Sequence, residues 1–243
     1  MFAGSTASLT VLGAPDYIVL TLTEFADQCH RICRAAELPL MVDADHGYGN
    51  ALNVMRTVEE LEAAGICGMS IEDTDLPQPH GTGGKPRMLS LEEGIGKMKA
   101  AVAARGDTGL MIAGRTSAPA IAGTQEAIRR AKAYEATGVD AIFLVGVKSK
   151  AELEAIAPEI TKPIVLGAPP ADLADRDALA ALGVRVCLQG HQPIRAAVKA
   201  IHDTLKALRD GTKPSELTGL PSSELMEVAT RQSQYDKARE DYL

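Results

Sequence analysis

The chain has 243 residues, of which 46% are hydrophobic, 23% are charged and 3% are aromatic, and its formal net charge is −7. A chain of this length can bury a full core without disulfides or metal staples, and it suits one α/β barrel domain of about 250 residues. The acidic balance, with no basic run, argues against nucleic acid as a partner. No apolar run approaches the roughly 18 residues of a membrane span, so we expect no membrane partner either.

Short apolar runs recur along the chain, and a helical pattern follows each of them. The runs are nearly continuously apolar, which is typical of parallel strands buried on both faces. The expected strands are Met1–Ser5, Leu40–Asp45, Gly68–Asp73, Leu110–Arg115, Ala141–Val145, Ile164–Gly167 and Val184–Leu188. This regular alternation of strand and helix predicts a parallel sheet, either open or closed.

Helix boundaries are marked by capping residues and glycines. Capping-box spacing predicts helix starts at Thr21–Glu24, Ser90–Glu93 and Ser149–Glu152. Asp172 could cap the short helix before Gly183, and Gly65, Gly138 and Gly183 each stand where a helix should stop.

Polar side chains gather at the carboxyl ends of the expected strands. These residues are Ser5, Asp43, Asp45, Glu72, Asp73, Arg115 and, just past the last strand, His191. In a (β/α)8 barrel all strand ends meet at one mouth, whereas in an open sheet ligands bind mainly at one switch point. The pattern therefore predicts an α/β fold of the (β/α)8 TIM-barrel type.

The segment DADHGYG places Asp43 and Asp45 on either side of Ala44. Because strand side chains alternate, both carboxylates would face the mouth. Two such groups repel each other unless a cation joins them, and Mg²⁺, with Mn²⁺ as an alternative, prefers oxygen ligands. The alternative is that both aspartates cap the next helix or pair with an arginine.

Glu72, Arg115 and His191 are further candidates for the site. Glu72 and Asp73 must face opposite ways, so we expect only Glu72 to help hold the metal, unless the two simply cap a helix. Arg115 suits a substrate carboxylate, but it could instead be a structural partner of Glu72. His191 either binds substrate or is a structural histidine.

A Pro/Gly-rich segment, Leu76–Met88, follows one of these strand ends. We interpret it as a mobile lid over the site, with an ordinary solvent loop as the alternative. The cysteines show no zinc or redox spacing, so we expect reduced, mostly packed thiols and a cytoplasmic location.

Together these motifs resemble the isocitrate lyase/phosphoenolpyruvate mutase superfamily, most closely its oxaloacetate decarboxylase branch. The resemblance covers essentially the whole chain. The segments that carry it are Gly4-Ser5, Gly13–Asp16, Val42–Asn50, Ile71-Glu72-Asp73, Ala113–Thr116 and Gly190-His191. The lyase branches carry a catalytic cysteine in the loop after Ile-Glu-Asp, and this loop has none, which puts isocitrate-type cleavage in doubt.

The resemblance implies a role for each position. Asp43 would be the direct Mg²⁺ ligand, with Asp45 and Glu72 acting through water. Ser5, Asp16, Arg115 and His191 would bind substrate, a small α-keto dicarboxylate, and Asp43, Arg115 and His191 would form the catalytic set. No organic cofactor is implied.

The implied reaction is Mg²⁺-dependent decarboxylation of oxaloacetate to pyruvate and CO₂ through a metal-stabilised enolate. Within the superfamily, a 2-methylisocitrate-type lyase or a phosphonopyruvate-processing enzyme remains an alternative. Outside it, a phosphate-binding barrel and a catalytically silent oligomeric scaffold remain.

We expect residues 1–212 to form the barrel and residues 213–243 to form a linker and one extra C-terminal helix for oligomer contact. The resemblance implies a dimer of dimers. With seven expected strands and a start inside a strand, the barrel is expected to lack its first strand–helix unit.

Overall fold

The computed structural model describes residues 1–106, 108–169, 173 and 175–243, which form two compact units, Met1–His191 and Gln192–Leu243. The first unit holds a seven-stranded sheet. The second holds α9 (Gln192–Arg209), α10 (Ser223–Thr230) and α11 (Gln232–Tyr242). Within the described residues no helix is both long and apolar enough to cross a membrane.

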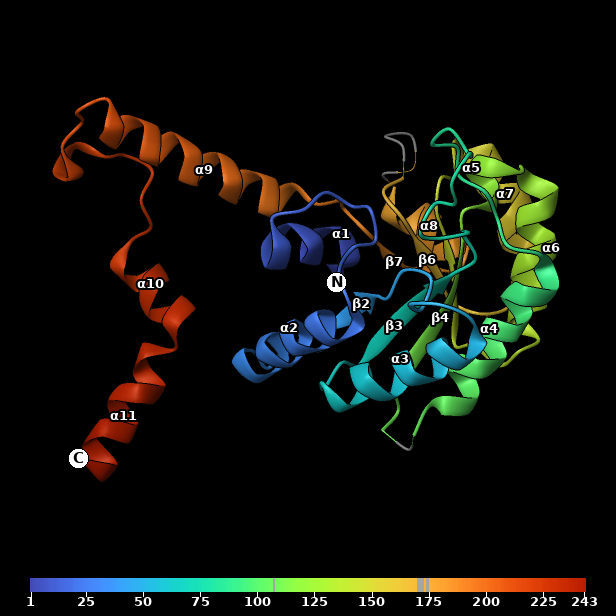
Figure 1. Ribbon diagram of the computed structural model, residues 1–243, viewed down its shortest axis with the longest axis horizontal. Coiled ribbons are helices and arrows are strands. Elements are labelled where there is room, and N and C mark those ends of the chain that lie inside the picture. The colour runs from blue at the N-terminus through green and yellow to red at the C-terminus, as the bar shows by residue number, and fades with distance from the viewer. Residues whose placement is uncertain (107, 170–172, 174) are drawn as a thin grey trace. The chain divides into compact units, whose positions relative to one another are not determined.

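The sheet confirms the expected parallel α/β architecture (Figure 1). Its strands are β1 (Phe2–Ala3), β2 (Met41–Asp43), β3 (Gly68–Glu72), β4 (Met111–Thr116), β5 (Ala141–Leu144), β6 (Ile164–Leu166) and β7 (Val184–Cys187). Each strand pairs in parallel with the next one in the chain, in the consecutive order of a TIM barrel. The sheet therefore has the seven strands that the sequence predicts.

Helices connect the strands. They are α1 (Gly4–Ala7), a π-helical turn (Ser8–Leu12), α2 (Leu22–Ala35), α3 (Ala51–Ala63), α4 (Leu91–Ala104), α5 (Ala118–Ile121), α6 (Thr124–Glu135), α7 (Lys150–Ile156), a 3₁₀ turn (Ala157–Glu159) and α8 (Arg176–Ala181). The side chains of Thr21, Ser90 and Ser149 accept backbone hydrogen bonds at the starts of α2, α4 and α7, as predicted. Asp175 caps α8, and Asp172 lies outside the described residues.

Three glycines stop helices where the sequence places them. Gly65, Gly138 and Gly183 have φ of +91°, +96° and +81°. These values lie in the left-handed region, where a residue with a Cβ is strained. The left-handed turn redirects the chain toward the next strand.

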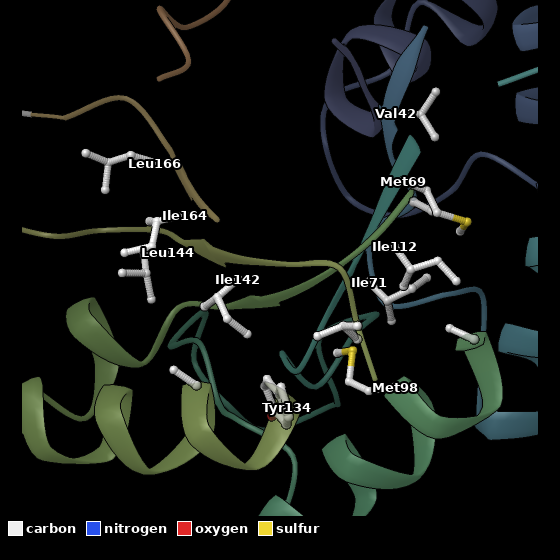
Figure 2. Packing of buried hydrophobic residues seen from close by; sticks show 14 of the residues in the cluster. Val42, Met69, Ile71, Met98, Ile112, Tyr134, Ile142, Leu144, Ile164 and Leu166 are labelled. Atoms are coloured by element: carbon white, nitrogen blue, oxygen red, sulfur yellow. The ribbon is translucent and has the colours of Figure 1, made fainter. Parts of the chain in front are cut away.

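The two faces of the sheet carry different cores because strand side chains alternate. Large side chains on the outer face, such as Ile71, Ile112 and Ile142, pack toward the helices with Met98 of α4 and Tyr134 of α6 (Figure 2). The inner face carries a smaller cluster, made of Ala113, Ala141, Phe143 and Val165. The strand residues whose side chains face inward therefore form the wall below the mouth of the barrel.

Two expectations about the ends of the chain need correction. The first strand stops at Ala3, and Ser5 lies in the helical turn of α1 rather than at a strand end. The last segment is not one helix, because Arg231 adopts a left-handed conformation (φ +56°) and separates α10 from α11.

Candidate active site

Three charged side chains of neighbouring strands share the inner face of the sheet. Asp43 ends β2, Glu72 ends β3, and Arg115 lies near the end of β4. Ser70 pairs in register with Asp43, and Glu72 pairs with Arg115. Since side chains two residues apart face the same way, the polar groups form one row across the strand ends.

This row opens into a cavity of about 890 Å³. The predicted site residues all contribute to its lining: Ser5, Asp16, Asp43, Asp45, Glu72, Arg115 and His191. They come from segments spread along the first 191 residues, brought together by the curvature of the sheet. The structure thus places the predicted residues in one concave site.

Arg115 forms the centre of the charged row. Its Nη1 donates to Asp43 Oδ2, and its Nη2 lies 3.2 Å from Glu72 Oε2. Its guanidinium also stands 5.5 Å from the centre of the Phe143 ring. Burial alone would lower the pKa of Arg115, but Asp43 and Glu72 raise it overall. The pairing with Glu72 that the sequence left as an alternative is present, together with a contact to Asp43.

Asp43 and Glu72 each have a second, uncharged partner. Ser70 Oγ donates to Asp43 Oδ1 at 2.9 Å, and Thr74 Oγ1 donates to Glu72 Oε2 at 2.9 Å. Burial raises the pKa of Glu72, Arg115 opposes that shift, and Asp43 adds to it. A carboxylate has about four acceptor sites, so both groups retain capacity for a further ligand.

Asp45 lies beyond the end of β2 in a left-handed turn, with φ of +49°. Its backbone carbonyl accepts from Glu72 N at 2.8 Å. A Cβ built on Gly4 would stand 2.2 Å from Asp45 Oδ2, so the carboxylate packs directly against that glycine. Burial, followed by the charges of Asp43 and Glu72, raises the pKa of Asp45 to about 8.

Asp16 and His191 lie elsewhere on the cavity wall. Partial enclosure and Asp43 raise the pKa of Asp16, while Arg115 and His191 lower it. His191 Nδ1 lies 3.4 Å from Thr6 Oγ1, in the turn that also carries Ser5. This contact joins the segment after β7 to the segment after β1.

Asp73 points to the outer face of the sheet, as the alternation predicts. It is fully buried, and its Oδ2 accepts from Arg130 Nη1 at 2.9 Å and from the Tyr134 hydroxyl at 2.6 Å. Both partners belong to α6. Asp73 therefore anchors β3 to the helix layer and does not line the cavity.

The carboxyl oxygens of this cavity wall are donors of the kind that Mg²⁺ binds. Within the described ranges, no three His, Cys, Asp or Glu side chains are arranged as a ready-made cage for a metal ion. Mg²⁺ does not require one, because it keeps several waters and binds through one or two carboxylates. Asp43, Asp45 and Glu72 supply carboxyl oxygen donors at one cavity wall. The chemistry of these residues therefore fits a hydrated magnesium ion.

Several lining residues were not singled out by the sequence. Among them are Tyr17 and Phe143, while Gln78 lies in the Leu76–Met88 segment that was interpreted as a lid over the site. Phe143 could have been found from alternation along β5, which places it on the inner face with Ala141. Tyr17 and Gln78 come from loops, where no periodic signal marks the inward side chain.

The sequence matches the phosphoenolpyruvate phosphomutase family over residues 1–209. This chain belongs to that family. A relative from Rhodopseudomonas palustris (strain BisB18), named oxaloacetate decarboxylase, is 59% identical over 231 residues, which cover 95% of this chain and 80% of the relative.

Solved structures share the fold of this chain. An oxaloacetate acetylhydrolase in complex with the inhibitor 3,3-difluorooxalacetate is 27% identical, with a TM-score of 0.84 over 98% of this chain and 83% of that one. A phosphonopyruvate hydrolase complex with oxalate and Mg²⁺ is 30% identical, with a TM-score of 0.83 over 99% and 86%. The seven-stranded sheet is thus the TIM-like fold of a family of enzymes.

Proposed function

We propose that this chain catalyses the Mg²⁺-dependent decarboxylation of oxaloacetate to pyruvate and CO₂. The observation that carries the proposal is the 59% identity to a relative named oxaloacetate decarboxylase, over nearly the whole chain. The cavity supports it, because an arginine stands among carboxylates at the strand ends. Such a site suits a small anionic substrate that binds together with a cation.

The charges of the cavity support a divalent ion. Its described lining has four acidic side chains, Asp16, Asp43, Asp45 and Glu72, and one arginine, Arg115. Oxaloacetate adds two further negative charges. Like charges in a partly desolvated site are costly unless a cation balances them. We therefore propose that Asp43 holds Mg²⁺ directly and that Asp45 and Glu72 hold it through water, with Mn²⁺ as a substitute.

Mg²⁺ held by Asp43, Asp45 and Glu72 would supply Lewis-acid stabilisation of the negative charge that develops on the 2-keto oxygen of the substrate. Arg115 and His191 orient the substrate carboxylates, and Ser5 and Asp16 bind the rest of the molecule. The bond between C3 and C4 breaks, CO₂ leaves, and the electron pair passes to the enolate of pyruvate. Solvent or a group of the Leu76–Met88 segment then delivers a proton to C3. No organic cofactor takes part.

The direct test measures pyruvate formed from oxaloacetate by the purified chain with Mg²⁺. We expect turnover well above the background of the metal alone. Asp43→Asn should reduce this turnover by more than about 100-fold, because the loss of an outer partner of a metal ligand already costs up to about 100-fold and Asp43 is proposed as a direct ligand. Asp27→Asn, an exposed change on α2, is the matched control and should be neutral. No pyruvate above background would refute the proposal.

The same assay separates the related activities. An acetylhydrolase would release oxalate and acetate from oxaloacetate, and a phosphonopyruvate enzyme would act on phosphonopyruvate in preference to it. A 2-methylisocitrate-type lyase would release pyruvate from a tricarboxylate. A silent scaffold would turn over none of these and would not need to bind Mg²⁺.

We also propose that residues 213–243 serve in homo-oligomer contact, as a dimer of dimers. The α10 helix of this segment carries the apolar residues Leu225, Met226 and Val228. Apolar side chains grouped on a short helix are typical of an interface. Light scattering on the eluted protein should give a tetramer mass, and a monomer would refute this proposal.

The cysteines bear on the proposed location. Cys29, Cys33, Cys67 and Cys187 are all free thiols. Free thiols are typical of reducing compartments. This supports the proposal of a cytoplasmic enzyme.

A further inference from the structure

The segment 75–88, called here the 75–88 loop, leaves β3 and returns beside it. Leu89 N donates to Asp73 O at 2.8 Å, and Asp75 N donates to Arg87 O at 2.8 Å. Thr74 and Met88 form an antiparallel bridge between these two bonds. The base of the loop is therefore a short two-stranded stem, and Leu76, Pro77 and Gln78 beyond it line the cavity.

Arg130 of α6 holds this stem from the outer face of the sheet. Its Nη1 donates to Asp73 Oδ2 at 2.9 Å, and its Nη2 donates to Leu89 O at 2.8 Å. One guanidinium thus binds the residue before the stem and the residue after it. Its Nε donates to Glu126 Oε1 at 2.7 Å, and its side chain is only 6% exposed. Each of the three guanidinium nitrogens of Arg130 thus donates a hydrogen bond, and the side chain is buried. The stem therefore has a rigid support.

Thr74 connects the stem to the cavity. The residue is 8% exposed, and its hydroxyl donates to Glu72 Oε2 at 2.9 Å. The same carboxylate oxygen lies 3.2 Å from Arg115 Nη2. The position of the stem therefore determines where one of the two hydrogen-bond partners of the Glu72 carboxylate stands.

We propose that Arg130 and Thr74 are positioning residues that couple the two faces of the sheet. Arg130 fixes the stem of the 75–88 loop from the helix layer, and Thr74 transmits that position to the Glu72 carboxylate inside the cavity. The loop and the carboxylate consequently move as one unit. The inference rests on the proposed function only for the role of Glu72 in holding Mg²⁺.

The first test uses Thr74→Val, which removes the hydroxyl and keeps the shape, beside Thr74→Ser, which keeps the hydroxyl. Hydrogen exchange of the Asp75 and Leu89 amides should rise in Thr74→Val. The Kd for Mg²⁺, measured by calorimetric titration, should rise about tenfold, as for other partners of metal-binding groups. Thr74→Ser should restore both values. Thr82→Val, the same change between Gly81 and Gly83 of the loop, should leave both unchanged.

The second test starts on the opposite face. Arg130→Lys keeps the charge, but one ammonium cannot replace three directed nitrogens. It should raise the Kd for Mg²⁺ although Arg130 does not line the cavity. Arg129→Lys is the matched control, since Arg129 is the adjacent residue, is 61% exposed and pairs with the same Glu126. In the double variant with Thr74→Val, the Arg130→Lys change should weaken Mg²⁺ binding no further, because the transmitting hydroxyl is already gone.

Unchanged exchange and unchanged Mg²⁺ binding in Thr74→Val would overturn the inference. Faster exchange with unaltered Mg²⁺ binding would overturn it too, because the stem would then not govern the carboxylate. So would full additivity in the double variant. A wild-type chain without Mg²⁺-dependent turnover would refute the proposed function alone, since the exchange and titration measurements need no activity.

Discussion

Arg115 Nη1 donates to Asp43 Oδ2 across the width of β3, from β4 to β2. The side chains are 17% and 12% exposed, and Glu72, the other partner of Arg115, is 6% exposed. The guanidinium is thus the cation that holds these two carboxylates together on one cavity wall. Its removal would leave two buried negative charges without a counter-charge.

The first prediction follows from this ion cluster. Arg115→Met should lower the free energy of unfolding by about 3–5 kcal/mol, the usual result of breaking a buried ion pair on one side. Chemical denaturation with Mg²⁺-free protein measures the effect. Arg56→Met removes an exposed pair with Glu60, in which the arginine is 66% exposed, and should cost about 0.3–0.5 kcal/mol. Equal effects of the two changes would contradict the buried role of Arg115.

The second prediction concerns ligand-linked stability. Oxalate resembles the enolate of pyruvate in shape and charge, and a related hydrolase has been solved with oxalate and Mg²⁺. Oxalate and Mg²⁺ together, with oxalate at about 100 times its Kd, should raise the free energy of unfolding by about 2.7 kcal/mol. Thermal unfolding should show no such gain with oxalate and a chelator, or in Asp43→Asn. A gain that survives chelation would place oxalate binding outside a metal site.

The third prediction concerns a buried lysine behind the DADHGYG turn. Lys97 of α4 is 3% exposed, and its Nζ donates to the carbonyl of His46 at 2.9 Å. Lys97→Met should lower the free energy of unfolding by about 1–3 kcal/mol, because that carbonyl loses its partner. Since His46 follows Asp45, Mg²⁺ binding should weaken as well. Lys99→Met, on the exposed side of the same helix, should alter neither quantity.

The fourth prediction concerns thiol reactivity. Cys67 is exposed, whereas burial raises the pKa of Cys29 to about 12. At pH 8 the thiolate fraction of Cys29 is then about one in ten thousand, and thiolate is the reactive form. A disulfide reagent should modify Cys67 in the folded protein and Cys29 only after unfolding, as judged by peptide mass spectrometry. Cys67→Ser should abolish the fast phase, and rapid labelling of Cys29 would contradict the structure.

The strand ends show how far sequence periodicity reaches. Alternation along β3 correctly separates Glu72, which lines the cavity, from Asp73, which binds Arg130 and Tyr134. Apolar runs and helix-ending glycines were sufficient to find the seven strands, because both signals are local. The roles of the individual site residues stay predictions, although their side chains share one cavity.

Other features depend on backbone turns or distant contacts, which periodicity does not encode. Asp45 reaches the cavity from a left-handed turn after β2 rather than by strand alternation. The break between α10 and α11 falls on Arg231, and arginine is not a residue type that predicts a positive φ. The hydrogen bond from the Thr74 hydroxyl to Glu72 depends on the stem of the 75–88 loop, which lies beside Glu72 through a contact between residues distant in the sequence.

The contact between Gly4 and Asp45 offers a way to disturb the site without altering a single charge or hydrogen-bonding group. A methyl group at position 4 would occupy the space of the Asp45 carboxylate, which lies 2.2 Å from the expected Cβ. Gly4→Ala should therefore displace that carboxylate and weaken Mg²⁺ binding by calorimetry, whereas Gly96→Ala, where a Cβ meets open space, should not. Unaltered binding in Gly4→Ala would show that Asp45 can move without consequence. The absence of a side chain at Gly4 thus leaves the space that the Asp45 carboxylate occupies. A single added methyl group next to the two-residue strand β1 would therefore alter the site by steric contact alone.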